Sequence, residues 1–201
     1  MSVRSVSVLL VLGLVVGCSG PVQGQELEIG AAAPEFSLKG VDGETHSLAD
    51  YKDKDVLVVI FHCNHCPVAT AYQDRMIAIQ KEYAQKGVQI VAINANDAEA
   101  FPADSFENMK KRAKEKGYNF PYLRDKSQEA AKAYGALVTP HVFLFDDARK
   151  LRYRGRIDDN WRDASKVTSK DLRAAIDAVL AGEQVPNPTT EQIGCSIKWK
   201  N

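Results

Sequence analysis

The chain has 201 residues, enough for one domain with a sizeable hydrophobic core. Hydrophobic residues make up 45% and charged residues 26%, which is typical of a globular protein and excludes a largely disordered chain. Because 26 Lys and Arg residues balance 26 Asp and Glu residues, the charge gives no reason to expect nucleic acid as a partner.

The first 24 residues have the layout of an export signal. Arg4 precedes an apolar run from Val6 to Val16, which is shorter than the roughly 20 residues that a membrane-spanning helix needs. The run is followed by Cys18 in "VVGC", which resembles a bacterial lipobox and implies that Cys18 receives lipid and becomes the mature N-terminus. An ordinary signal cleaved after Gly24 is the alternative. The sequence thus predicts an exported protein of the bacterial cell envelope or periplasm, with lipid as its link to the membrane.

After this leader, strand-like and helix-like segments alternate, which predicts an α/β fold with a mixed sheet and helices on both of its faces. The turn "VDGE" between two short extended pieces predicts an N-terminal β-extension. Continuous apolar runs indicate buried strands, and amphipathic stretches ended by glycine indicate helices. In chain order we expect strands or extended pieces over 55–61, 88–94, 120–125, 141–146 and 151–157, and helices over 67–87, 105–117, 127–135 and 169–182. The tail, 183–201, shows little periodicity.

Three cysteines follow the leader, and two of them form the C-x-x-C motif "CNHC" at the end of the first buried run. Disulfides form and persist outside the cytoplasm, so an exported C-x-x-C indicates a redox couple. Cys63 lies at a junction between strand and helix, where unpaired N–H groups and the helix dipole stabilise a thiolate. We therefore expect Cys63 to be exposed, to have a lowered pKa and to attack, and Cys66 to resolve the mixed disulfide. A purely structural bridge is the alternative, but a loop of two residues stabilises little.

The order strand, C-x-x-C, helix, strand, helix, "VTP", hairpin, helix resembles the thioredoxin fold. The segments "APEFSL" and "FPYLRDKSQEAAKAYGALVTPHVFLFDDARKLRYRG" resemble the TlpA and peroxiredoxin-like branch of that superfamily, which is related to AhpC/TSA proteins and other redoxins. The resemblance covers residues 26–182. It implies a thiol–disulfide oxidoreductase without a cofactor, whose partners are protein thiols or disulfides and a redox partner protein.

The same resemblance implies roles for three further residues. Pro140 matches a cis-proline that faces the C-x-x-C, and Thr139 before it has a backbone free to pair with a substrate strand; a trans-proline at an edge strand is the alternative. His65 matches a histidine of oxidising members, where a protonated imidazole favours the thiolate. An exposed polar turn residue is the alternative for His65.

Three positions depart from the family pattern. Leu57 stands where thioredoxins have a buried acid, His62 where they have tryptophan, and Ala69 where TlpA-type reductases often have glutamate. The sequence therefore shows no carboxylate that would take up the proton during resolution.

A thiol peroxidase is one alternative function. Peroxiredoxins use P-x-x-x-T-x-x-C followed by proline, and Cys66 with Pro67 matches that ending. However, Cys63 replaces the threonine and Val59 replaces the first proline, and the second arginine of that site is absent near Pro140.

A Cu(I)-binding protein similar to Sco-type copper proteins is the other alternative. His62, His65 and His141 lie beside the C-x-x-C or Pro140, and we expect the fold to bring them together; thiolates with imidazole suit Cu(I) or Zn(II). Sco-type proteins, however, use the longer C-x-x-x-C.

Cys195, in "IGCSIKWK", has two interpretations. It is either a small hydrophobe packed with Ile193, Ile197 and Trp199, or an extra resolving thiol. The tail resembles the ending of a peroxiredoxin-like subgroup that carries this C-x-x-C.

Overall fold

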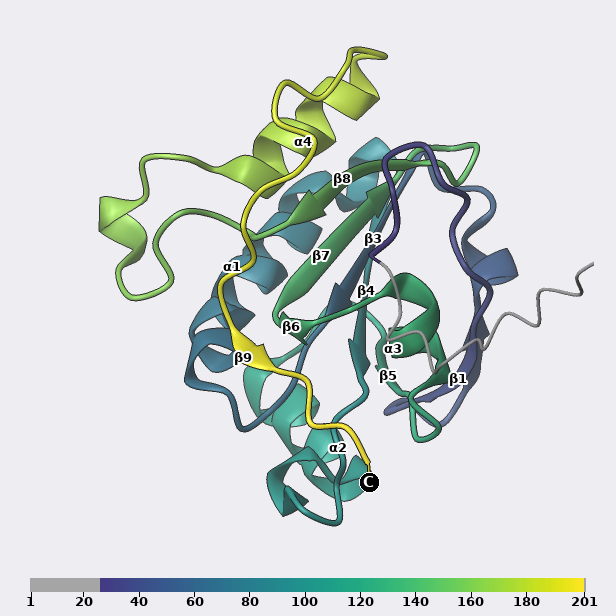
Figure 1. Ribbon diagram of the computed structural model, residues 1–201, viewed down its shortest axis with the longest axis vertical. Helices are drawn as coiled ribbons and strands as arrows, with labels where there is room; N and C mark the ends of the chain where they lie inside the picture. Colours follow the sequence, from purple (N-terminus) through teal and green to yellow (C-terminus); the bar gives the residue numbers. More distant parts are fainter. Residues whose placement is uncertain (1–25, 201) are drawn as a thin grey trace, which may run out of the picture.

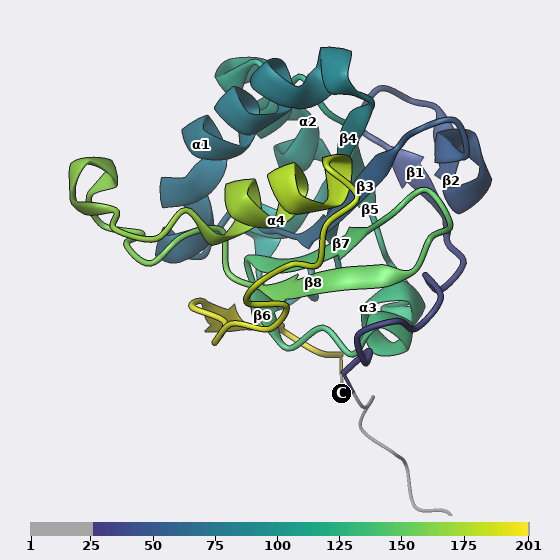
Figure 2. The same ribbon diagram turned by 90° about the horizontal axis from the view of Figure 1, so that it is seen from above.

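The computed structural model describes residues 26–200. The predicted leader and the proposed lipidation site at Cys18 lie outside the described residues. The core is a seven-stranded mixed sheet in the order β2-β1-β5-β4-β3-β7-β8, as Figure 1 and Figure 2 show from two directions. Its strands are β1 (Ser37–Gly40), β2 (Thr45–Ser47), β3 (Val56–Phe61), β4 (Val88–Asn94), β5 (Tyr122–Arg124), β7 (His141–Phe145) and β8 (Leu151–Gly155). A separate two-stranded sheet pairs β6 (Val138–Thr139) with β9 (Cys195–Ser196).

Helices cover both faces of this sheet, as the sequence predicts. One face packs against three helices and the other against one helix and a 3₁₀ turn (Figure 2). The helices are α1 (Pro67–Tyr83), α2 (Phe106–Lys116), α3 (Glu129–Tyr134) and α4 (Asp171–Leu180), and α3 is the one that lies alone on its face. Short 3₁₀ turns occupy Leu48–Tyr51, Ala84–Lys86, Pro102–Asp104 and Ala164–Lys166. Within residues 26–200, no helix combines the length and apolar character that crossing a membrane requires.

Strand β3 is the centre of the sheet, and its sequence explains why. All six residues of "VLVVIF" are completely buried. Alternate side chains enter the two cores: Ile60 faces the side of α1 and α4, whereas Leu57 and Phe61 face the side of α3. β3 pairs in parallel with β4 and antiparallel with β7. A strand buried on both faces needs a continuous apolar run, which is the pattern that predicted it.

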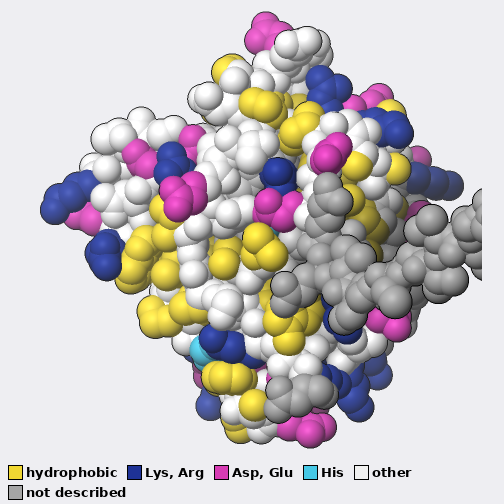
Figure 3. All heavy atoms as spheres, in the orientation of Figure 1, with side chains coloured by type: hydrophobic (Ala, Val, Ile, Leu, Met, Phe, Trp, Pro, Cys, Tyr) yellow, Lys and Arg dark blue, Asp and Glu magenta, His cyan; other side chains and the backbone are white. Residues whose placement is uncertain are grey.

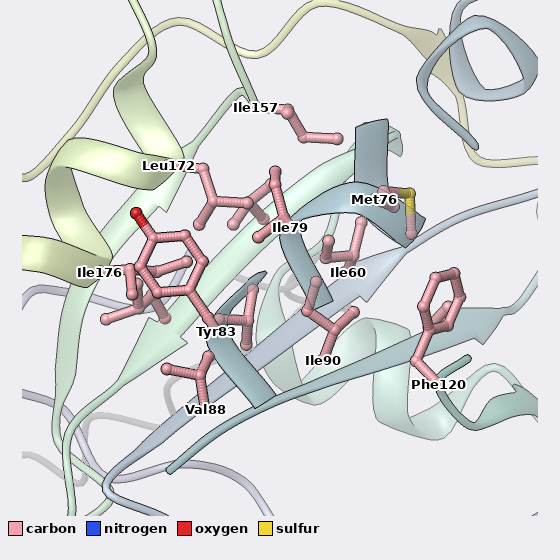
Figure 4. Close-up of a cluster of buried hydrophobic side chains, with 14 of the residues drawn as sticks. Ile60, Met76, Ile79, Tyr83, Val88, Ile90, Phe120, Ile157, Leu172 and Ile176 are labelled. Atoms are coloured by element: carbon pink, nitrogen blue, oxygen red, sulfur yellow. The ribbon is translucent and has the colours of Figure 1, made fainter. Parts of the chain in front are cut away.

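Helix α1 begins directly after the C-x-x-C, and one apolar stripe packs it against the sheet. Met76, Ile79 and Tyr83 pack against the sheet, together with side chains of β3, β4 and α4 (Figure 4). Pro67 is the first residue of the helix, which ends at Tyr83; the 3₁₀ turn Ala84–Lys86 follows, and Gly87 caps that turn with a φ of 77°. The helical segment thus starts and stops where the sequence predicts, because proline suits the first turn and glycine a left-handed cap.

The tail departs from the prediction of little regular structure. Residues 195–196 form β9, which pairs antiparallel with β6 so that Cys195 lies opposite Thr139. Farther back, Thr190 N–H donates to the carbonyl of Arg154 in β8 at 3.1 Å. The tail crosses the end of the sheet where β3 meets α1 (Figure 1). A strand of two residues has no period that a sequence pattern would reveal.

Candidate active site

The C-x-x-C occupies the connection between β3 and α1. Cys66 is the N-cap of α1, and Cys63 lies two residues after β3 ends. Both thiols are free, and both side chains are completely buried. The exposed position expected for Cys63 is therefore wrong. Val68 and Cys195 pack against the two cysteines, and the tail that supplies Cys195 was not predicted to lie there.

The Thr139–Pro140 peptide bond is cis and faces the motif. Cys63 Sγ lies 3.0 Å from Thr139 Oγ1, and Cys66 Sγ lies 3.3 Å from the carbonyl oxygen of Thr139. One residue thus contacts both sulfurs of the C-x-x-C, although 76 positions separate Cys63 from Thr139. The cis-proline thus lies against the C-x-x-C, as the family resemblance implies.

The third thiol completes this group of sulfurs. Cys195 Sγ lies 2.8 Å from Cys66 Sγ, and the Cys195 side chain is partly exposed. Of the side chains expected to pack around Cys195, Ile197 is buried in the core while Trp199 is 41% exposed. Figure 3 views this side of the molecule, where apolar side chains reach the surface beside the tail.

The pKa order of the thiols is opposite to the expectation. The Cys63 thiol hydrogen-bonds to Cys66, which lowers the pKa of Cys66 and raises that of Cys63. Hydrogen bonds from the Cys195 thiol and from the backbone of Ala69 and Cys195 add to this and outweigh burial, so the pKa of Cys66 falls to about 4. Burial and the neighbouring Cys66 raise the pKa of Cys195 to about 11. These interactions favour a thiolate at Cys66 over one at Cys63 or Cys195, and Cys66 lies at the positive end of α1.

A buried carboxylate, Asp104, lies beside the motif and was missed from the sequence. It follows a loop after β4, and it accepts hydrogen bonds from Asn64 N–H at 2.7 Å and from Asn94 Nδ2 and Asn96 Nδ2, each at 3.0 Å. These bonds, with that of His65, outweigh burial and lower the pKa of Asp104. In the sequence, Asp104 is notable only because it precedes Ser105, the N-cap of α2. That position indicates the start of a helix and gives no sign of an active-site residue.

Asp104 binds the histidine of the motif. His65 Nδ1 lies 2.5 Å from Asp104 Oδ2, and the imidazole stacks on Phe101. Cys63, His65 and Asp104 each offer an atom within 4.8 Å of the others, the one such group of three that residues 26–200 contain. When His65 is protonated, Asp104 balances its charge, so His65 does not act on the thiols as an isolated cation. Thus a carboxylate is present near Cys63 after all.

The other two histidines are not part of this group, so the expected gathering of three imidazoles is wrong. His62 is buried against Tyr118, whose hydroxyl lies 3.1 Å from its Nε2. His141 begins β7 and accepts the Leu137 N–H at Nδ1. Burial lowers the pKa of His62 to about 4 and, with Arg154, that of His141 to about 3. Both imidazoles are therefore neutral packing residues near neutral pH.

Known proteins resemble the chain in both sequence and structure. The model of the AhpC/TSA family matches residues 29–154. The thiol-disulfide oxidoreductase ResA of Geobacillus thermodenitrificans is 29% identical over 126 residues, which is 62% of this chain and 67% of that protein. An uncharacterized conserved protein from Geobacillus kaustophilus has a TM-score of 0.83 at 47% identity, over 89% of this chain and 96% of the other. A thioredoxin family thiol:disulfide interchange protein from Chlorobium tepidum TLS shares the fold, with a TM-score of 0.59 at 23% identity, over 78% of this chain and 99% of the other.

Proposed function

Since the chain belongs to the AhpC/TSA family and is a thioredoxin-fold redox enzyme, we propose that it is a thiol–disulfide oxidoreductase whose redox couple is Cys63 and Cys66. One observation carries this proposal: two buried free thiols lie at the start of α1 and both contact Thr139 beside a cis-proline. The names of the relatives agree with this activity.

The electrostatics suggest an order for the two thiols that differs from the sequence-based one. A thiolate at Cys66 attacks one sulfur of a partner disulfide, forming a mixed disulfide and releasing a partner thiolate. Cys63 then loses its proton and attacks Cys66, which forms the Cys63–Cys66 disulfide and releases the second partner thiol. His65 and Asp104 lie within reach of the proton that Cys63 gives up. Thr139 and Pro140 shape the surface on which the partner disulfide approaches.

Trapping experiments test this proposal. In a Cys195→Ser background, the Cys63→Ser variant should accumulate a mixed disulfide with a disulfide-bonded model substrate, since no second thiol releases the substrate. The Cys66→Ser variant should accumulate none. The reverse result would restore attack by Cys63, and no covalent intermediate in either variant would refute the oxidoreductase mechanism.

The location of the protein is a second part of the proposal. The leader pattern supports export, with lipid on Cys18 as the link to the membrane. Mass spectrometry of the mature chain from its native host tests this. A diacylated N-terminus at Cys18, lost in Cys18→Ala, supports the anchor. A chain that starts at Gln25 supports export with ordinary cleavage, and an intact Met1 refutes export.

A further inference from the structure

The tail is bound at the edge where a substrate peptide would pair. β9 forms an antiparallel pair with Val138 and Thr139, and Ile197 N–H donates to the carbonyl of Leu137 at 2.9 Å. The backbone groups of Leu137 to Thr139 that would add a substrate strand are thus engaged by residues of the same chain.

Glycine permits this close approach. A Cβ atom at Gly194 would overlap the carbonyl group of Thr139 and lie 3.2 Å from the nitrogen of Pro140. The tail backbone therefore lies directly against the cis peptide, in a position that a residue with a side chain cannot reach without displacement. Gly194 is the feature of the sequence that makes the docked arrangement feasible.

Contacts on both sides of β9 hold the tail in place. After β9, Ile197 is only 3% exposed and belongs to the hydrophobic core on the face of the sheet that α3 covers. Lys198 N–H donates to Asn96 Oδ1 at 2.8 Å, and Asp97 N–H donates to the Lys198 carbonyl at 2.8 Å. Before β9, the N–H group of Thr190 in the tail donates a hydrogen bond to the carbonyl of Arg154 in β8. A segment fixed at both ends presents its central thiol at a defined place.

That place is against Cys66. The two sulfurs are 2.8 Å apart, and a disulfide bond is about 2.05 Å long, so they need to close by less than about 1 Å. Cys63 and Cys66 are completely buried, whereas Cys195 is partly exposed. Cys195 is accordingly the one residue of these three that has surface accessible to solvent.

We propose that Cys195 is a third redox thiol, that its disulfide partner is Cys66, and that the tail strand carrying it takes the place of a substrate peptide on β6. This rests on the proposed function of the Cys63–Cys66 couple. In the internal step, the Cys195 thiolate attacks Cys66 Sγ of the Cys63–Cys66 disulfide. The Cys66–Cys195 bond forms, the Cys63–Cys66 bond breaks, and Cys63 leaves as a thiolate that takes up the proton released by Cys195. No electrons are gained or lost.

The outcome of this step is an oxidised protein in which Cys63 is free and the disulfide extends to the surface at Cys195. An external thiol then meets Cys195 first. Its attack on Cys195 forms a mixed disulfide and releases Cys66, whose thiolate is a good leaving group because of its low pKa. Cys66 is thus the sulfur common to both disulfides.

Peptide mapping tests the proposal directly. Trypsin places Cys63 and Cys66 together in peptide 55–75, Cys195 in peptide 174–198 and Cys18 in peptide 5–39. The full chain is reduced, oxidised with oxidised glutathione, which is thereby reduced to two thiols, then alkylated in acid and digested without reductant. We expect peptide 55–75 linked to peptide 174–198 in the wild type and in Cys63→Ser, and no such link in Cys66→Ser or Cys195→Ser.

Gly194→Ala provides the matched control for the docked strand, because it removes no thiol. In the Cys63→Ser background, where Cys66 and Cys195 remain, it should lower the yield of the linked peptides by about tenfold, as expected when an inserted methyl group displaces a packed segment. A wild type that forms only the disulfide within peptide 55–75, or a link that survives Cys66→Ser, would overturn the proposal. If that internal disulfide forms and exchange with the model substrate continues, the proposed function stands and only the role of Cys195 falls. If neither disulfide forms and exchange is absent, the proposed function itself fails.

Discussion

The reduced protein should hold a thiolate at Cys66 across the neutral pH range, and its redox potential should show this. The pKa of Cys66 is lowered to about 4, while those of Cys63 and Cys195 are raised. Between about pH 5 and 8 the reduced site therefore contains one thiolate. This holds whether Cys66 forms its disulfide with Cys63 or with Cys195 in the oxidised protein. Reduction of the disulfide by two electrons then takes up one proton instead of two. The potential should fall by about 30 mV per pH unit, half of the roughly 60 mV that two protons would give.

Equilibration with glutathione buffers of known potential at several pH values measures this slope. The oxidised fraction is read by alkylation and mass spectrometry. The ultraviolet absorbance of the thiolate supplies an independent signal. It should disappear below about pH 4 in the wild type, disappear at a higher pH in Cys63→Ser because the Cys63 thiol is the largest cause of the low pKa, and be absent near neutral pH in Cys66→Ser. A slope near 60 mV throughout, or a thiolate signal that survives Cys66→Ser, would refute the charge assignment.

The same ionisation contributes to stability with a definite sign. The pKa of Cys66 falls from 9.0 to about 4 on folding, so its contribution is complete above pH 9, decreases as the pH falls and is gone below about pH 4. Each pH unit in this window is worth about 1.4 kcal/mol. The difference in unfolding free energy between the reduced wild type and Cys66→Ser should therefore increase with pH from 5 to 8 by that amount per unit. Denaturant titrations that show a constant difference would contradict this expectation.

Three substitutions test other parts of the structure by denaturant unfolding. Asp104→Ala removes the carboxylate that accepts hydrogen bonds from three buried donors and pairs with the His65 ring, and should lower the unfolding free energy by about 3–5 kcal/mol; a loss below about 1 kcal/mol would mean that water replaces the carboxylate. Gly155 has a φ of 141°, and in Gly155→Ala the added Cβ would overlap the backbone of Thr190, so the substitution should lower the unfolding free energy by about 1–3 kcal/mol. Unchanged stability would show that the tail can move away from β8 at this point without cost. Leu57→Ala empties a completely buried position in β3 and should cost about 2–5 kcal/mol, so a loss under about 1 kcal/mol would mean that the core closes around it.

The sequence predicted those features that short patterns encode. The run from Val56 to Phe61 identified the central strand, because only an uninterrupted apolar stretch suits burial on both faces. Pro67 and Gly87 identified the start and the end of the helical segment that consists of α1 and the 3₁₀ turn after it. The C-x-x-C and the Thr139–Pro140 pair identified two halves of one site, because the family resemblance relates these positions to each other.

The remaining parts of the site depend on contacts between distant segments. Asp104 lies 39 positions from His65, and Cys195 lies 129 positions from Cys66. Neither belongs to a periodic segment: Asp104 ends a 3₁₀ turn, and Cys195 starts a strand of two residues. Cys195 packs against both thiols of the motif and adds to the lowering of the Cys66 pKa, so the sequence-based prediction of an exposed, acidic Cys63 lacked one of the groups that decide it.

A thiolate at Cys66 also affects the reduction potential of the protein. Interactions that stabilise a thiolate exist only in the reduced state, so they favour reduction of the protein and raise its potential. Cys63 and Cys195 do not offset this near neutral pH, because both remain protonated there. Because Cys66 takes part in either disulfide, the effect applies to both. The electrostatics of the site therefore raise the reduction potential of any disulfide that Cys66 forms, relative to the same disulfide with an ordinary thiol at that position.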